Sequence, residues 1–411
     1  MLETITKCRG CRSSKILEVL PLQSIPIGTH FSREPNQELV YPIGLTLCEK
    51  CELVQLTQKI HRPTVFRQHL SGASIPLFDR KEVKSKISES STFPKTGNRN
   101  IVLEIGGPSD SIEHETVSKI DQVSSSSLSQ VQERVVYVHG ATYSFNQFDE
   151  ETVAKYLDCY GQVDEVRVDN STKTQHPLHL SNVDDPLVYV SNLEKIVKPE
   201  GRVVIRTPYL GAIVREGFLD YVYHEHQSYF SLRSITKLFL NLGFNIFSAC
   251  MCENDNLNAE FVFIKNRVAA NYSLSLKKFL SVEGLLDLDK PSTYKQLGTH
   301  LKSRRKRVQQ ELNNMQTTTI VGYGASVATV SMMYQYQIVN FLDFLVDDDH
   351  KKIGLFCPSA NLRVRKTGAL YMDNVGVLVL LASRFAKEIM QRHSQFTGKV
   401  IIPTLGWSRS S

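Results

Sequence analysis

The stretch NVDDPLVYVSNLEKIVKPEGRVVIRTPYL, residues 182–210, decides the fold class. Apolar side chains recur at helical spacing over residues 187–197 and predict an amphipathic helix. The tripeptide PEG (199–201) predicts a turn, and RVVIRTP (202–208) is the apolar run of a buried strand. A helix followed directly by a buried strand is the repeating unit of an α/β domain.

The same alternation continues on both sides of this stretch. Further runs typical of strands occupy residues 101–107, 131–140, 162–169, 244–249 and 260–264. Residues 231–243 predict a helix, because apolar side chains recur at helical spacing and Gly243 supplies a C-cap. Strands alternating with helices predict a doubly wound α/β domain.

A second, smaller α/β unit begins at TTTIVGYGAS (317–326). A strand there runs into Gly322-x-Gly324 and then a helix, and Asp347 ends the next strand. This pattern is similar to a dinucleotide-binding turn, but Val327 stands at the third glycine position, and a lone G-x-G is a weak signal. A nucleotide site and a turn required only for packing both remain open.

Composition sets broad limits. The chain has 411 residues, is 41% hydrophobic and 22% charged, and carries a net charge of +6. The longest apolar run, residues 375–382, is far shorter than the roughly 18 residues of a membrane span, and no secretory signal begins the chain. We therefore expect a soluble, cytoplasmic protein that does not bind membranes.

One basic run, LKSRRKRVQQEL (301–312), leaves a nucleic-acid methyltransferase or binder as an alternative. A basic run at helical spacing is more often a solvated helix face, and nucleic-acid binders usually gather positive charge into one patch. We therefore expect no nucleic-acid partner.

Four cysteines form two matched pairs, Cys8-x-x-Cys11 and Cys48-x-x-Cys51, 36 residues apart. Each C-x2-C turn presents two thiolates to one ion, and two such turns complete a closed, four-thiolate Zn²⁺ site. The absence of an open coordination position predicts a structural zinc rather than a catalytic one.

Ionisable side chains crowd into YHEHQSYFS (223–231). Tyr, His and Glu are the usual groups for proton transfer, so this cluster is the candidate catalytic site. Two alternatives stay open: a metal pair at His224 and His226, and a purely structural cluster.

Upstream, IVLEIGGPSD (101–110) places glycines directly after a buried strand. Such a turn lets a ligand approach the backbone closely. A tight turn without a ligand is the alternative.

In this order, the motifs resemble those of sugar C-methyltransferases of deoxysugar biosynthesis, which act on nucleotide-linked keto-sugars with S-adenosylmethionine (SAM). The resemblance covers nearly the whole chain and is most specific at YHEHQSYFS; it also rests on CRGC (8–11), SGAS (71–74), VLEIGG (102–107), residues 182–210, VGYGASVAT (321–329) and LVDDDHKKIG (345–354). It implies a zinc-binding domain and substrate arm at 1–85, a class I methyltransferase domain with a Rossmann-like fold at 86–266, a helical linker at 267–315 and a Rossmann-like domain at 316–411.

The resemblance also implies a mechanism. A base removes the acidic proton beside the keto group, and the resulting enolate attacks the methyl group of SAM. By motif position, His226 and Tyr223 would transfer the proton, Glu225 would orient them, and His224 and Tyr229 would shape the pocket.

Binding residues follow from the same resemblance. The SAM contacts would be Glu104, Gly106, Gly107, Asp110 and Asp121. The substrate contacts would be His69, Ser71, Ser74, Tyr209, Tyr229 and, toward the nucleotide, Gly322, Tyr323, Gly324, Ala325, Ser326 and Asp347.

The sequence departs from the family pattern at several positions. In the SAM turn, EIGGPSDS (104–111), the family's aspartate is displaced or replaced and its final glycine is missing, and His69 stands where the family usually has a tyrosine. These departures keep a second interpretation open, in which the chain is a non-catalytic relative that binds a nucleotide sugar or a protein partner.

Overall fold

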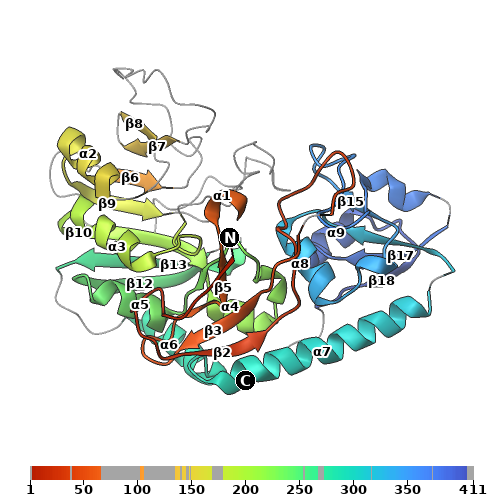
Figure 1. Ribbon diagram of the computed structural model, residues 1–411, viewed down its shortest axis with the longest axis horizontal. Helices are drawn as coiled ribbons and strands as arrows, with labels where there is room; N and C mark the ends of the chain where they lie inside the picture. Colours follow the sequence, from red (N-terminus) through yellow and green to blue (C-terminus); the bar gives the residue numbers. More distant parts are fainter. Residues whose placement is uncertain are drawn as a thin grey trace.

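The computed structural model describes residues 2–37, 39–65, 102–105, 135–138, 141–144, 148, 150–168, 179–252, 255–266, 273–315, 317–372 and 374–404. The elements of this part of the chain form two α/β units, with the N-terminal strands against the first and a long helix running between them (Figure 1).

The N-terminal region contributes two small sheets. The four-stranded sheet has the order β11-β4-β3-β2, with β2 (Ile16–Pro21), β3 (Gly44–Cys48), β4 (Val54–Leu56) and β11 (Ser228–Tyr229). The second sheet pairs β1 (Leu2–Thr4) with β5 (Gln58–Ile60), and α1 (Arg62–Val65) follows. The edge strand β11 comes from far along the chain, so the N-terminal sheet is completed by the central unit.

The central unit is a seven-stranded sheet in the order β12-β13-β10-β9-β6-β7-β8. Its strands are β6 (Val102–Ile105), β7 (Val135–Val138), β8 (Ala141–Ser144), β9 (Val163–Val168), β10 (Val197–Pro208), β12 (Phe244–Cys252) and β13 (Asp255–Lys265). The middle strands β6, β9 and β10 are parallel, whereas β13 is antiparallel to β10 and β7 is antiparallel to β6. The strand order reverses at β6, so the carboxyl end of β6 is the switch point at which open α/β sheets bind ligands.

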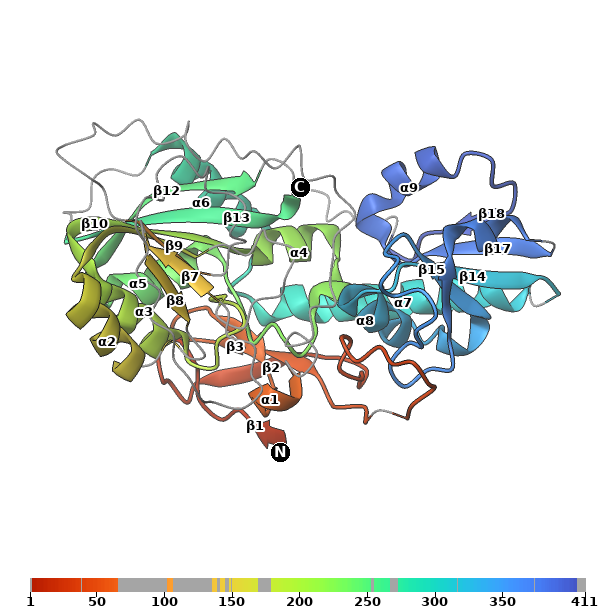
Figure 2. The ribbon, with the colours of Figure 1, turned by 90° about the horizontal axis from the view of Figure 1, so that it is seen from above.

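Helices α2 (Glu150–Tyr160), α3 (Pro186–Ile196) and α5 (Leu232–Leu240) pack in a row against this sheet (Figure 2). The short α4 (Leu210–Glu216) and the 3-10 helix η4 (Leu219–Tyr221) follow β10. Asp185 caps the N-terminus of α3 by accepting a hydrogen bond from the N–H of Val188, and Pro186 occupies the first turn. Both residue types favour a helix start at this position.

The expected helical linker, residues 267–315, contains α6 (Leu274–Leu286) and α7 (Pro291–Asn313). Helix α7 packs along β2 and reaches the C-terminal unit (Figures 1 and 2). Its buried side chains recur every three or four positions; they include Tyr294, Leu297, Leu301, Val308 and Leu312. This spacing forms the apolar stripe that an amphipathic helix turns toward a core.

The C-terminal unit is a five-stranded, fully parallel sheet in the order β16-β15-β14-β17-β18. Its strands are β14 (Thr319–Tyr323), β15 (Phe344–Asp347), β16 (Val364–Lys366), β17 (Val375–Leu380) and β18 (Lys399–Ile401). Its helices are α8 (Val327–Gln335) and α9 (Ala386–Arg392), with the 3-10 turns η5 (Val339–Phe341), η6 (Thr367–Tyr371) and η7 (Ser383–Phe385).

These sheets confirm the predicted fold class: an α/β chain with two doubly wound units and a small N-terminal domain. Two details differ from the predictions. The strand predicted at 131–140 is described only as β7, and β8 pairs beside it. The predicted turn at 199–201 is a register shift inside β10, where Glu200 has a positive φ of 62°. The domain boundaries stay a prediction. Within the described ranges, no helix is both long and apolar enough to cross a membrane.

Candidate functional site

Residues 221–229, here called the histidine segment, link η4 to α5 and are buried. Tyr223, His224, Glu225 and His226 are each at most 4% exposed. The end of the segment forms β11, which pairs with β4 of the N-terminal sheet. Its start follows η4, which packs against α8 of the C-terminal unit. The segment therefore lies where the three parts of the chain meet.

Tyr223 and His226 are in direct contact. The Tyr223 hydroxyl lies 3.2 Å from His226 Nε2, and the two rings are 4.3 Å apart. His226 Nδ1 lies 3.3 Å from the carbonyl oxygen of Tyr221. Because a carbonyl oxygen can only accept, Nδ1 carries the proton, and Nε2 is left to accept from the Tyr223 hydroxyl.

Burial keeps this pair uncharged. It lowers the pKa of His226 and of His224 to about 4 and raises the pKa of Tyr223 well above its usual value. All three groups are therefore neutral near pH 7. A neutral imidazole bonded to a phenol can take up a proton that the phenol relays.

Glu225 is fully buried, and no hydrogen bond joins its carboxylate to His226. Burial raises its pKa to about 7, and the nearby Thr29 hydroxyl offsets part of the rise. Neither carboxylate oxygen accepts a well-aligned hydrogen bond from the described residues. The Tyr221 carbonyl contacts His226 Nδ1, and the predicted role of Glu225 in orienting the pair stays a prediction.

The C-terminal unit reaches this site through Arg384. Its guanidinium carbon lies 4.5 Å from the centroid of the Tyr221 ring. Burial raises the pKa of the Asp220 carboxyl group to about 6, and the positive charge of Arg384 opposes this rise. Sequence reasoning missed Arg384 and Asp220, because no local motif marks a pair so far apart in the chain.

His224 and Tyr229 also point to backbone carbonyls. His224 Nε2 lies 3.3 Å from the carbonyl oxygen of Ile25, and the Tyr229 hydroxyl donates to that of Tyr221 at 3.4 Å. The nitrogens of His224 and His226 thus face different acceptors, which speaks against a shared metal ion. Their predicted roles in shaping a pocket stay predictions.

Tyr209 packs against α6. Its hydroxyl donates to Glu283 of α6 at 3.0 Å, and its ring packs against Phe279 at 5.1 Å between centroids. Glu283 also accepts hydrogen bonds from the N–H groups of Leu232 and Arg233. These contacts anchor α5, whereas the predicted substrate contact of Tyr209 remains untested.

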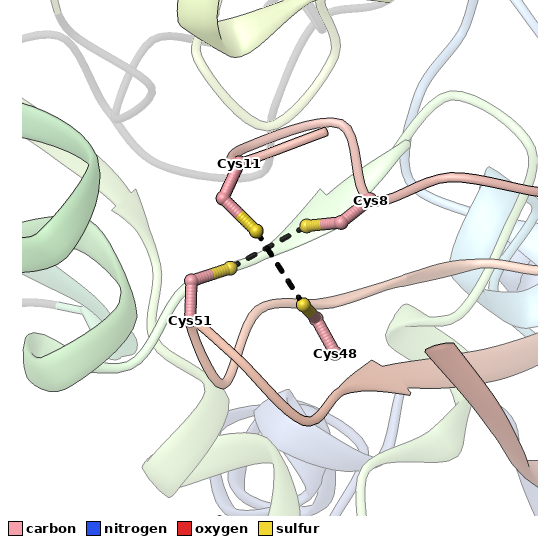
Figure 3. A group of neighbouring side chains, drawn as sticks. All are labelled: Cys8, Cys11, Cys48 and Cys51. Carbon is pink, nitrogen blue, oxygen red and sulfur yellow. Dashed lines mark hydrogen bonds between the residues drawn. The ribbon is translucent and has the colours of Figure 1, made fainter. Parts of the chain in front are cut away.

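The four cysteines of the two C-x2-C turns converge (Figure 3). All four sulfurs lie within 4.8 Å of one another, with 3.4 Å between Cys8 and Cys51 and 3.6 Å between Cys11 and Cys48. A tetrahedral zinc with Zn–S bonds of about 2.3 Å places its sulfurs about 3.8 Å apart. The cluster therefore fits one zinc ion with no position left for a substrate.

The backbone N–H groups of the turn after β14 find hydrogen-bond acceptors within the protein. Three successive N–H groups have acceptors: Gly324 donates to Val346 O (2.8 Å), Ala325 to Asp347 Oδ2 (2.6 Å) and Ser326 to Thr329 Oγ1 (2.7 Å). At Gly322, an added Cβ would lie 2.7 Å from the Leu345 side chain. Both observations favour the packing interpretation of this turn over a phosphate cradle.

Tyr323, the remaining predicted nucleotide contact, turns toward the end of β15. Its hydroxyl donates to Asp348 at 2.8 Å and lies 3.1 Å from His393 Nε2. His393 Nδ1 lies 2.9 Å from the hydroxyl of Tyr371. A contact of Tyr323 with a nucleotide stays a prediction.

The basic run lies on α7 and is partly packed. Arg304 is 9% exposed and donates to the carbonyls of Ile402 and Pro403. Arg305 donates to the carbonyl of Gln335. These contacts use two of the cations in structural roles, which weakens the nucleic-acid alternative.

Several predicted binding residues lie outside the described residues: His69, Ser71, Ser74, Gly106, Gly107, Asp110 and Asp121. The backbone of Glu104 lies in β6, but its side chain is not among those described.

Comparisons with known proteins agree with these features. Residues 261–404 match a family model described as C-methyltransferase C-terminal domain, and residues 8–66 match one described as a zinc binding domain. The C-methyltransferase NovU of Streptomyces niveus is 20% identical to this chain over 98% of the chain and 96% of its own length. The match over the cysteine cluster confirms the predicted structural zinc.

Solved structures resemble smaller parts of the chain. A SAM-dependent methyltransferase of Thermotoga maritima is 13% identical, covering 26% of this chain and 56% of its own, with a TM-score of 0.20. An S-adenosylmethionine dependent methyltransferase of Listeria monocytogenes is 10% identical, covering 26% and 62%, with a TM-score of 0.21. The chain thus spans little more than half the length of these structures.

Proposed function

We propose, on the premise that this chain belongs to the C-methyltransferase family, that it transfers a methyl group from SAM to a carbon atom of a nucleotide-linked keto-sugar. The observation that carries the proposal is the buried, uncharged Tyr223–His226 pair. Buried ionisable groups are costly unless they are satisfied or used, and a pair that can pass a proton is suited to removing one from carbon.

The first step removes a proton from the ring carbon beside the keto group. In our proposal the phenol oxygen of Tyr223 takes this proton while its own proton passes to Nε2 of His226. The products are an enolate and an imidazolium. The charge of Glu225 lies close enough to Tyr223 to affect its pKa, so ionised Glu225 would stabilise the imidazolium.

SAM, when bound, supplies the electrophilic methyl group that the enolate carbon takes. The predicted SAM turn follows β6, and the reversal of strand order at β6 supports a ligand site at that end of the sheet. The assignment of Glu104, Gly106, Gly107, Asp110 and Asp121 to SAM remains a proposal.

The proposed location is the cytoplasm. Four thiolates closing a zinc site, together with further free cysteines, suit a reducing compartment. The proposed partner is a small-molecule nucleotide sugar.

The test combines binding and turnover. Calorimetric titration of the zinc-loaded protein with SAM should show binding, and labelled SAM should methylate a member of a panel of nucleotide-linked 4-keto-sugars. Tyr223→Phe should lower the rate by about 10²–10⁴-fold, the usual contribution of a positioned acid–base group.

Tyr294→Phe is the matched control, because it removes another buried tyrosine hydroxyl, which donates to the backbone carbonyl of Leu288 at 2.6 Å. It should keep the wild-type rate. An unchanged rate in Tyr223→Phe would overturn the proton-transfer assignment. Failure of the wild type to bind SAM would favour the non-catalytic relative.

A further inference from the structure

The side chain of Arg9 reaches from the zinc site to the histidine segment. Arg9 lies between the zinc ligands Cys8 and Cys11 and is only 4% exposed. Its Nη2 donates to Oε1 of Gln227 at 2.8 Å, and its Nη1 donates to the carbonyl of Asp184 at 2.9 Å. A residue fixed by the metal turn thus contacts the residue that follows His226.

Gln227 makes further hydrogen bonds that hold the backbone around His226. Its side-chain amide donates to the carbonyl of His224 at 2.5 Å. Its backbone N–H donates to Ser181 at 2.7 Å, and its carbonyl accepts from Leu56 of β4 at 3.1 Å. His226 lies in the chain between His224 and Gln227, and the side chain of Gln227 is hydrogen-bonded to the backbone of His224.

A second link holds the metal turn to the same strand. The backbone N–H of Arg9 donates to Oε1 of Gln55 at 2.8 Å, and Nε2 of Gln55 donates to the carbonyl of Lys7 at 3.3 Å. Gln55 lies in β4, is fully buried and pairs with Ser228 of β11. The first zinc turn, β4 and the end of the histidine segment thus form one hydrogen-bonded unit.

We propose that Arg9 and Gln227 are positioning residues, through which the closed zinc site sets the place and ring orientation of His226. A residue that only filled the space between the two zinc-binding cysteines would need no charge. A buried guanidinium is costly unless hydrogen bonds satisfy it, and Arg9 directs two of its nitrogens to the histidine segment and to the stretch before α3. The consequence for catalysis rests on the proposed function, whereas the structural coupling does not.

The test compares Arg9→Met with Arg12→Met. Methionine keeps most of the length of arginine but none of its donors. Arg12 is the matched control, because it belongs to the same zinc turn but pairs with Asp185, and its side chain is 48% exposed. Three quantities are measured for each variant: zinc per chain, hydrogen exchange of residues 223–229, and the nitrogen shifts of the His226 ring.

We expect Arg9→Met to keep one zinc ion but to exchange residues 223–229 at least tenfold faster. His226 should change from the single Nδ1–H tautomer to a mixture, and kcat should fall with little change in KM. Arg9→Lys should restore part of the protection by donating to Gln227. Zinc chelation in the wild type should reproduce the faster exchange, and Arg12→Met should behave as wild type.

Should Arg9→Met fail to fold, Gln227→Met removes the same hydrogen bond from the other side and should have the same effects. Wild-type exchange and a single His226 tautomer in these variants would overturn the proposal. Loss of zinc from Arg9→Met would also overturn it, because Arg9 would then act by retaining the metal and not by positioning His226. Exchange and tautomer need no turnover, so an inactive wild type would contradict only the proposed function.

Discussion

Glu225 gives the stability of this protein a defined dependence on pH. Burial raises its pKa from 4.5 to about 7, so the folded chain binds this proton more tightly than the unfolded chain. The stabilising contribution of that proton is complete below about pH 4.5 and is lost as the pH rises through 7. His224 and His226 have the opposite sign: their contribution is complete above pH 6.5 and is lost as the pH falls through about 4.

Glu225→Gln removes the contribution of the Glu225 proton to stability and leaves that of the two histidines. Relative to wild type, the free energy of unfolding of the variant should therefore rise by about 2 kcal/mol between pH 5 and pH 8, at about 1.4 kcal/mol per pKa unit. Urea unfolding at both pH values measures this difference. The exposed Glu388→Gln in α9 serves as control and should show none. A difference that shrinks toward pH 8 would contradict the raised pKa.

At this scale, the sequence predicts residue types better than contacts. The family resemblance implies that Tyr223 and His226 act together, and the two side chains do touch. The residues around them come from elsewhere: Arg384 from the C-terminal unit and Arg9 from the zinc turn. A single sequence carries no signal for such long-range pairs, since each depends on how complete domains pack.

Helix α6 determines how α5 begins. Glu283 is 1% exposed and accepts from Leu232 N–H at 2.5 Å, Arg233 N–H at 3.2 Å and the Tyr209 hydroxyl at 3.0 Å. The first N–H groups of a helix have no partner within it, so this carboxylate from another helix supplies one. Ser231 and Ser234 add a capping box at the same end.

Glu283→Gln should lower the free energy of unfolding by about 1–3 kcal/mol, because the carboxamide replaces one of the two acceptor oxygens with a donor, which cannot pair with the N–H group of Leu232 or Arg233. Combined with Tyr209→Phe, the effects should be non-additive by at least about 0.5 kcal/mol, as for residues in one network. Tyr334→Phe, whose hydroxyl donates to Ser359 in the C-terminal unit, should instead be additive. Additivity of Glu283→Gln with Tyr209→Phe would contradict a shared network.

Elements with a strong apolar period could be predicted, and those defined by pairing could not. The strand at 202–208 and the helix at 187–197 were expected from periodicity, because burial on one or both faces imposes it. Strand β16 has only one buried residue, Val364, and was not expected. Strand β11 is just two residues long and exists because β4 lies beside it. Its pairing partner is not encoded locally.

The N-terminal region meets the C-terminal unit at a close backbone contact. Gly28 packs against the start of α8, and an added Cβ would lie 2.9 Å from Cα and 3.2 Å from the carbonyl oxygen of Val327. Neighbouring contacts reinforce this junction. Ser331 of α8 donates to the carbonyl of Val222 at 3.0 Å, and Ser32 pairs with Phe356. The start of the histidine segment therefore depends on the docking of the C-terminal unit.

Gly28→Ala should loosen this junction, because backbone atoms cannot move aside as a flexible side chain can. Overpacking of this kind costs about 1–3 kcal/mol, so the midpoint of urea unfolding should fall. Limited proteolysis should also separate the C-terminal unit faster than in the wild type. Gly368→Ala is the matched control, since nothing lies within 4 Å of its added Cβ. Equal stability of the two variants would mean that Gly28 and α8 are not in contact in solution, and Arg384 would then have no fixed place beside Tyr221.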